Sequence, residues 1–454
     1  MHKRTAWLVA PLLLIFLWSV GEGASALNIP VKYHKLANGL KIVLSPDHTA
    51  PLAVVGVYYN IGLRIEPKNR TGFAHLFEHM MFQGSQNLAK GELFRLIQGL
   101  GGKLNASTRF DFTNYFEIVP SSKLETALWA EADRMKGLVL NQEKLANQQG
   151  VVINEVKVNV LNQPYGGFPW LDMPQLANEN WYNAHNFYGD LKDLEAATLQ
   201  DVQDFFNSYY TPNNAALVVV GDFAPSEALS LIEKYFGDIR PVKRPDFPDL
   251  AEPRQEKEKI FNKDDPLANR PALALAYHMP ERFTPEYFAL GLLDQILLQG
   301  DDSLLYQALV KKAGLTAGVP GGINLLGNMF NYNGPMLWLA FLYYDIQTPT
   351  EKIISEFDSV IDSVRTKPVG QEILDRALVK LRSSLYDTME DFLGFGRADL
   401  LASFALFDDD PGRINLLEEK FKAVTPALIL KTAQEYLRPT NRTQLTIHPK
   451  KAGQ

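Results

Sequence analysis

The residues best placed to do chemistry lie between positions 75 and 79. His75 and His79 are four residues apart, so on a helix both imidazoles lie on one face, one turn apart. Two imidazoles at this spacing can bind one Zn²⁺, and Glu78 lies on nearly the same side without being forced into the coordination shell. The flanking residues are apolar and predict a buried helix. The alternative interpretation is a polar cluster without a metal, but burying a charged glutamate between two histidines would cost free energy unless it had partners.

A catalytic zinc site needs a third protein ligand and an open position for water. Five other histidines lack paired spacing and are expected to be structural or at the surface: His34, His48, His185, His278 and His448. A carboxylate is therefore the expected third ligand. The helix expected over residues 141–160 offers Glu155, on a face shared with Val151 and Val152, and spacing alone leaves it one candidate among several.

The elements that must position these residues belong to an internal repeat that occurs twice in the sequence. Residues 198–214 match residues 425–441 at an offset of 227, with Thr, Pro and Asn at corresponding positions. Each segment predicts a helix that begins after a threonine cap and ends before a proline, and each leads into a strand, at 216–220 and 445–448. Strands are also expected at 52–59 and 272–277, again in matching order.

The two copies define the expected fold and its divisions. Strands and helices alternate too irregularly for a parallel βαβ series. We predict an α+β fold: two tandem homologous α/β-sandwich repeats, each a mostly antiparallel sheet covered by helices, forming a clamshell around a chamber. The expected divisions are a signal peptide at 1–26, an N-terminal repeat with the zinc site at 27–240, a linker rich in proline and charge at 241–270, and a C-terminal repeat without a metal site at 271–454.

Composition limits the class and the location of the protein. The 454 residues are 46% hydrophobic and can form large cores in two or three domains. The chain lacks cysteine, which excludes disulfides and thiolate metal sites, and its net charge of −7 argues against nucleic acid as the main partner. Lys3, Arg4, a short apolar run and the ending Ala24-Ser25-Ala26 predict a signal peptide, with a membrane anchor as the alternative. We expect the mature protein to be exported to the periplasm, or else secreted, without a membrane segment.

His75-x-x-Glu78-His79 together with Glu155 resembles the inverzincin, or pitrilysin-type, zinc peptidases. In that family the metal helix is followed, at a similar distance along the chain, by a glutamate ligand. The stretch that begins Asn105-Ala106 and the two-copy layout are also similar to the family, over most of the mature chain. The particular similarity is to the short, two-repeat bacterial branch related to mitochondrial processing peptidase.

The resemblance implies a role for each matching residue of the metal helix. His75, His79 and Glu155 would hold one Zn²⁺ per chain, although such a donor set also suits Mn²⁺ or Co²⁺. Glu78 would be the general base that takes a proton from the zinc-bound water and passes it to the leaving amine. The implied activity is that of an exported zinc-dependent endopeptidase or oligopeptidase acting on unstructured peptides.

The resemblance also implies a place for the peptide substrate. Asn105, Ala106 and Ser107 match the family's substrate-side edge strand, on which an extended peptide adds as another strand. Backbone pairing of this kind would tolerate many substrate sequences. These three residues are therefore the expected substrate-binding residues.

The chain departs from the family pattern in two places. Seven residues before Glu155, where many members carry a glutamate that supports the ligands, this chain has Gln148, which keeps hydrogen bonding but loses the charge. The second half has no metal motif, and the stretch after Gly334 lacks the family's transition-state arginine; Tyr343 or Tyr344 could supply the accompanying tyrosine or be plain strand residues. The implied partner is a sister subunit without the zinc motif, or a second copy of this chain.

Two other functions are alternatives. The chain could be a non-catalytic scaffold or partner subunit of a peptidase-like complex, a kind of family member that usually loses its metal ligands. It could also be a structural zinc protein, but such sites are usually closed by four protein ligands, often cysteines, and here the identifiable set stops at three.

Overall fold

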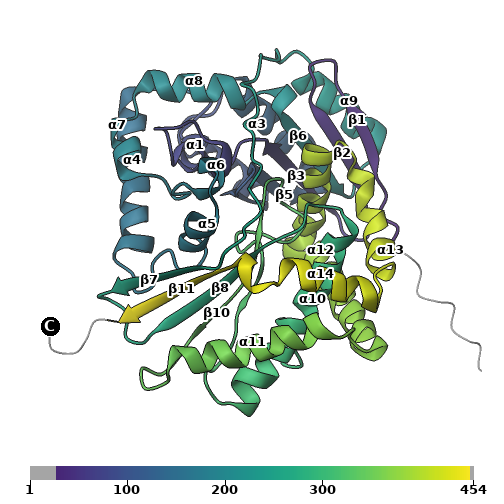
Figure 1. The fold of residues 1–454 in the computed structure, drawn as a ribbon. Helices are drawn as coiled ribbons and strands as arrows, with labels where there is room; N and C mark the ends of the chain where they lie inside the picture. The colour runs from purple at the N-terminus through teal and green to yellow at the C-terminus, as the bar shows by residue number, and fades with distance from the viewer. Residues whose placement is uncertain (1–26, 450–454) are drawn as a thin grey trace, which may run out of the picture.

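The computed structural model describes residues 27–449, which form two halves with one sheet each (Figure 1). The N-terminal sheet has the order β1-β2-β6-β3-β5-β4, and the C-terminal sheet has the order β7-β11-β8-β10-β9. The first sheet consists of β1 (Lys32–Lys35), β2 (Lys41–Pro46), β3 (Leu52–Tyr59), β4 (Lys103–Thr108), β5 (Thr113–Pro120) and β6 (Ala215–Gly221). The second consists of β7 (Lys259–Asp265), β8 (Ala272–His278), β9 (Gly321–Ile323), β10 (Leu337–Tyr343) and β11 (Arg442–Pro449). The predicted signal peptide, residues 1–26, lies outside the described residues.

Both sheets repeat one topology. β2 pairs with β6 in parallel, and β7 pairs with β11 in parallel, whereas every other neighbouring pair is antiparallel. Beyond the parallel pair, the first sheet continues through β3, β5 and β4, and the second continues through β8, β10 and β9. The predicted fold class, two tandem α/β repeats with mostly antiparallel sheets, is confirmed.

The first half has nine α-helices among the described residues. They are α1 (Phe73–Met80), α2 (Glu92–Gly99), α3 (Leu124–Lys136), α4 (Gln142–Val156), α5 (Asp172–Ala177), α6 (Trp181–Ala184), α7 (Leu191–Ala196), α8 (Leu199–Tyr209) and α9 (Pro225–Phe236). α1, α2 and α3 pack on the first sheet, whereas α5 packs on β7, β8 and β11 of the second sheet. α1 packs on β4 and β5 and against α4. Its apolar side chains Phe73, Leu76, Phe77 and Met80 are buried in the core against the first sheet, so the sheet fixes the helix that carries the two histidines.

The second half contributes α10 (Pro285–Leu297), α11 (Thr350–Thr366), α12 (Gln371–Asp408), α13 (Leu417–Lys422) and α14 (Pro426–Tyr436). α12 is interrupted by non-helical backbone from residue 391 to residue 394, and it packs on β2, β3 and β6 of the first half. Phe395 stacks on Phe116 at 3.8 Å, and the Tyr58 hydroxyl donates to Asp399. One apolar core therefore continues across both halves.

A buried ion pair lies where the two halves meet. Arg64 Nε donates to Asp111 Oδ1 at 2.7 Å, and both side chains are buried. Asp111 also accepts a hydrogen bond from the backbone N–H of Asn333, at 2.8 Å, from a loop of the second half. This loop is thereby fixed to the turn that joins β4 and β5.

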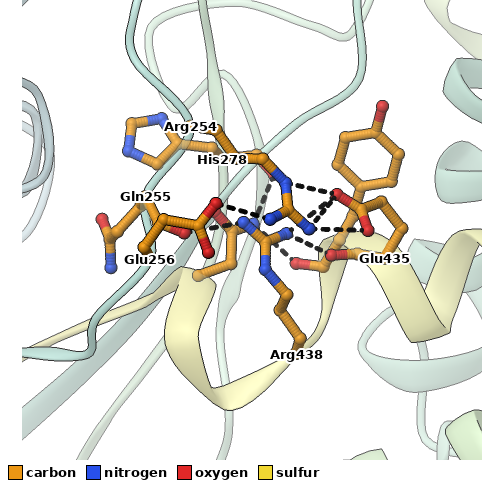
Figure 2. A network of polar contacts seen from close by, with 8 residues as sticks. Arg254, Gln255, Glu256, His278, Glu435 and Arg438 are labelled. Atoms are coloured by element: carbon orange, nitrogen blue, oxygen red, sulfur yellow. Dashed lines mark hydrogen bonds and ion pairs between the residues drawn. The ribbon is translucent and has the colours of Figure 1, made fainter.

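The predicted linker at 241–270 is only partly a linker. β7 lies inside it and belongs to the second sheet, so that sheet begins earlier than residue 271. The sequence analysis did not predict this strand, because it lies at a sheet edge and its sequence, KIFNKDD, is mostly polar. The segment before β7 is also held in place: Arg254 contacts Glu256 and Glu435, and Arg438 donates to the Gln255 carbonyl (Figure 2).

Between residues 27 and 449, every helix falls short of the length or the apolar character that a membrane span needs.

Candidate metal centre

α1 and α4 bring His75, His79 and Glu155 together. The Nε2 atoms of the two histidines are 3.3 Å apart, and they lie 3.6 Å and 3.4 Å from Glu155 Oε1 and Oε2 respectively. Donor atoms about 2.0–2.1 Å from a tetrahedral zinc ion lie roughly 3.3 Å from one another. The separations and the donor set, two imidazoles and one carboxylate, therefore fit Zn²⁺. Among residues 27–449 this is the one group of three or more such side chains that could hold a metal ion.

The start of α1 is fixed by contacts outside the histidine motif. Gly72 precedes the helix with a φ of 84°, in the left-handed region that favours glycine. The carboxylate of Glu66 accepts hydrogen bonds from the backbone N–H groups of Gly72 and Ala74, at 2.8 and 2.6 Å. A carboxylate at this end also complements the helix dipole. Glu66, which the sequence did not single out, thus caps the start of the helix that carries the candidate ligands His75 and His79.

Glu78 lies beside the ligand cluster without being part of it. Its Oε2 accepts a hydrogen bond of 2.6 Å from the Thr108 hydroxyl on β4. Burial raises the pKa of Glu78, although this hydrogen bond and the charge of His79 act in the opposite direction. A carboxylate whose pKa is moved toward neutrality is suited to accept and return a proton.

The surroundings set the charge of each ligand. Burial lowers the pKa of His75 to about 4, so at neutral pH this imidazole is uncharged, the form that binds a metal. Burial also opposes the charge on His79, but the hydrogen bond with Glu155 and its negative charge outweigh burial and raise the pKa of His79. The same hydrogen bond from His79 is the main reason that the pKa of Glu155 falls to about 2. Glu155 is therefore ionised at neutral pH, the form in which a carboxylate can bind a metal.

Two further side chains contact the ligands. Gln148, expected near them, is buried on α4, and a hydrogen bond with its side chain helps to raise the pKa of His79. The Tyr188 hydroxyl donates to Glu155 Oε1 at 3.0 Å, and the Tyr188 ring stacks on His75. Tyr188 was missed from sequence because it stands 33 residues from Glu155, between α6 and α7, in no periodic pattern.

Asn105, Ala106 and Ser107 lie on β4, which is an edge strand of the first sheet. The same strand carries Thr108, which hydrogen-bonds Glu78. The Arg109 N–H donates to the Phe112 carbonyl, and hydrogen-bonded pairs alternate along an antiparallel ladder. The backbone groups of Asn105 and Ser107 therefore point to β5, and those of Ala106 point away from it. The Ala106 N–H donates to Asn105 Oδ1 at 2.9 Å. Among the described residues, no strand pairs with β4 on the side that the Ala106 backbone faces.

The other candidate residues lie elsewhere. The Tyr343 ring packs on Tyr165, and the Tyr344 hydroxyl contacts the Thr350 hydroxyl. The histidines expected to be structural or at the surface are all outside the metal cluster: His34, His48, His185, His278 and His448. An arginine does interact with Glu78, but it belongs to the first half: Arg109 follows β4, and its charge partly opposes the rise that burial causes in the pKa of Glu78. Arg109 also donates to the Leu326 carbonyl of the second half.

Comparison with known proteins finds relatives along most of the chain. Residues 41–165 match the family model described as Insulinase (Peptidase family M16), and residues 196–381 match the model described as Peptidase M16 inactive domain. The chain is 25% identical over 425 residues to the zinc protease PqqE of Helicobacter pylori, which covers 91% of this chain and 92% of that protein. It is 26% identical over 246 residues to the mitochondrial-processing peptidase subunit beta of Rattus norvegicus, which covers 54% of this chain and 50% of that protein.

A solved structure has the same fold. The crystal structure of a protease from Helicobacter pylori superposes with a TM-score of 0.85 and 24% identity, over 93% of this chain and 100% of that one. The first matched family model spans His75, His79 and Glu155, and the second reaches from the end of the first half into the second. From the two family models and the relative that spans nearly the whole chain, we conclude that this chain belongs to the pitrilysin-type peptidase family M16.

Proposed function

We propose that this chain is an exported zinc-dependent endopeptidase or oligopeptidase that hydrolyses unstructured peptides. The observation that carries the proposal is the convergence of candidate ligand atoms of His75, His79 and Glu155 within 4.8 Å of one another, with Glu78 next in sequence to His79 and hydrogen-bonded to Thr108 of the edge strand β4. One Zn²⁺ held by these three residues would polarise the scissile carbonyl and make the attacking water more acidic.

The chain's own residues would position the peptide and move the proton. An extended peptide adds to β4 through the outward-facing backbone groups of Ala106, which makes binding tolerant of side-chain sequence. Glu78 takes a proton from the attacking water and returns it to the leaving amine. The hydrogen bond from Thr108 holds Glu78 on the side where this peptide lies.

We further propose that a partner completes the site. Within the described part of the second half there is no metal cluster, and Tyr343 and Tyr344 are engaged in other contacts. A sister subunit without the zinc motif, or a second copy of this chain, would supply an arginine and a tyrosine to the transition state. Export, to the periplasm or by secretion, rests on the sequence of residues 1–26.

The test is cleavage of a quenched, unstructured peptide by the zinc-loaded mature chain. Glu78→Gln is expected to lower kcat/KM by about 100-fold or more, because it removes the base while keeping the shape of the side chain. Glu143→Gln, an exposed change on α4, is the matched control and is expected to be neutral. Equal cleavage by the wild type and Glu78→Gln would refute the proposed mechanism. A wild-type chain that binds one zinc but cleaves nothing would direct the search to a co-purifying sister subunit.

A non-catalytic scaffold or partner subunit is the alternative function. The observation on its side is the match of residues 196–381 to a family model described as an inactive domain. Bound zinc without hydrolysis, in the presence of every co-purifying partner, would favour this alternative.

A further inference from the structure

Tyr188 contacts two of the three proposed ligands at once. Its hydroxyl donates to Glu155 Oε1 at 3.0 Å. Its ring lies over the His75 imidazole, with 5.3 Å between ring centroids and 17° between ring planes. One side chain thereby restrains a ligand on α4 and a ligand on α1.

Tyr188 is itself held by neighbours. Asn159 Nδ2 donates to the Tyr188 oxygen at 3.2 Å, and the Trp170 ring packs edge-on against the Tyr188 ring at 5.5 Å. Because the phenol oxygen accepts from Asn159, its own hydrogen is free to point at Glu155. Asn159 lies in the π-helical turn Lys157–Leu161 that follows α4, and such turns are frequent at functional sites.

The two ligands need this support for different reasons. The Glu155 side chain is 33% exposed, so burial alone does not fix the orientation of its carboxylate. The hydrogen bond from Tyr188 holds the carboxylate with Oε1 at 3.6 Å from His75 Nε2 and Oε2 at 3.4 Å from His79 Nε2. His75 Nδ1 is buried without a hydrogen-bond partner among the described residues, so it lacks the outer hydrogen bond that usually orients a metal-binding imidazole. Stacking on Tyr188 is the contact that takes its place.

We propose that Tyr188 is a positioning residue of the metal centre: it fixes the Glu155 carboxylate against the two histidines and fixes the ring plane of His75. The inference rests on the proposed zinc site and adds to it a residue that does not touch the metal. It assigns the hydroxyl and the ring of Tyr188 separate tasks, which different substitutions can separate.

The experiment measures the Zn²⁺ affinity of the full mature chain by competition with a chelator. Tyr188→Phe, which removes only the hydroxyl, is expected to weaken binding by about 10–100-fold, the usual effect of losing a contact to a metal ligand. Tyr188→Leu, which also removes the stacked ring, is expected to weaken it further. Tyr165→Phe is the matched control, because it removes a hydroxyl that hydrogen-bonds Asn269 and the Arg270 carbonyl, away from the centre.

A second readout separates positioning from general stability. The visible spectrum of the Co²⁺-loaded chain is expected to shift in Tyr188→Phe and to stay unchanged in Tyr165→Phe, while the Tm of the metal-free chain changes little in either. Asn159→Ala, an exposed change that removes the donor to Tyr188, is expected to weaken Zn²⁺ binding to a smaller extent and serves if Tyr188→Phe does not fold.

The outcomes distinguish this inference from the proposed function. A wild-type chain that binds no Zn²⁺ overturns the proposed function and the inference together. A wild-type chain that binds one Zn²⁺, with Tyr188→Phe equal to it in affinity and in Co²⁺ spectrum, overturns the inference alone.

Discussion

The protein itself brings two of the three candidate ligands, His75 and Glu155, into the charge state that binds a metal. Burial keeps His75 neutral, with a pKa of about 4, and the hydrogen bond from His79 keeps Glu155 ionised, with a pKa of about 2. His79 is the ligand whose pKa is raised, so acid competes with the metal first at His79. The residue that modulates this ligand from outside is Gln148.

We predict that Gln148→Glu tightens Zn²⁺ binding by about 10-fold, because a carboxylate that accepts a hydrogen bond from His79 makes the imidazole a stronger ligand. Chelator competition measures the affinity. Gln142→Glu, an exposed change on the same helix, controls for the added negative charge. Unchanged or weaker binding in Gln148→Glu would mean that charge at this position does not tune the site.

The predictable residues are those whose spacing is local. His75, Glu78 and His79 follow from one turn of helix, but Glu155 needed the family resemblance because spacing left several carboxylates open. Glu66 and Tyr188 could not be predicted from a pattern. They act through contacts between segments that are distant in sequence or irregular in backbone, which only the packed chain defines.

Among the elements, β4 and α1 carry most of the proposed activity. β4 offers its outward backbone groups to a peptide, while Ser107 pairs with Asn114 on β5. α1 is fixed by Gly72 and by the Glu66 cap. Each feature can be tested with a neighbouring or equivalent residue as control.

Ala106→Pro is expected to lower kcat/KM for peptides by about 10-fold or more while zinc affinity is retained, because it removes an N–H that faces the peptide and not β5. Ser107→Pro, one residue further, removes an N–H of the β4–β5 ladder and is expected to lower Tm. Kinetics and thermal unfolding of both variants decide the matter. A normal kcat/KM in Ala106→Pro would exclude strand addition at this position.

Gly72→Ala is expected to destabilise the protein more than Gly91→Ala. Both glycines have positive φ at a helix start, which costs an alanine about 1–2 kcal/mol. A Cβ at Gly72 would also lie 3.0 Å from the Gly189 Cα, whereas a Cβ at Gly91 meets nothing within 4 Å. Denaturant unfolding measures the difference, and zinc affinity should fall only in Gly72→Ala. Equal losses of unfolding free energy in the two variants would show that the close approach of Gly72 to Gly189 does not matter for stability.

The repeat made several paired elements predictable, since α8 and α14 begin at matching threonine caps and lead into matching strands. β7 could not be predicted from the sequence, because a solvated edge strand lacks the alternating apolar pattern that marks a half-buried strand.

At the scale of the whole molecule, the arrangement of the two halves depends on the contacts between them. α12 covers the first sheet, Arg64 and Asp111 join a loop of the second half, and His278 at the end of β8 lies 3.3 Å from the Ala177 carbonyl of α5. None of these contacts is visible as a motif. They follow from how the two repeats pack.

We predict that stability falls on acidification partly through His278. Burial lowers its pKa to about 4, and Lys259 and Arg438 add to the effect. The unfolded chain, in which the pKa is 6.5, therefore binds the proton first, and the stabilisation present above pH 6.5 is lost as the pH falls to 4. Its size is on the order of 3 kcal/mol.

Denaturant unfolding of the metal-free chain at several pH values tests this prediction. His278→Gln should flatten the loss of stability between pH 6.5 and 4, and the exposed His48→Gln should not. Parallel pH profiles for the wild type and His278→Gln would contradict the assignment.

The most direct test of the central claim is to titrate zinc into the metal-free mature chain and to measure bound zinc and peptide hydrolysis in the same samples. If the chain is a zinc peptidase, hydrolysis by the chain, alone or with its sister subunit, reaches a plateau at one zinc per chain and is absent in Glu155→Gln. Hydrolysis that persists unchanged after complete zinc removal, or a wild-type chain that binds no zinc, would contradict it.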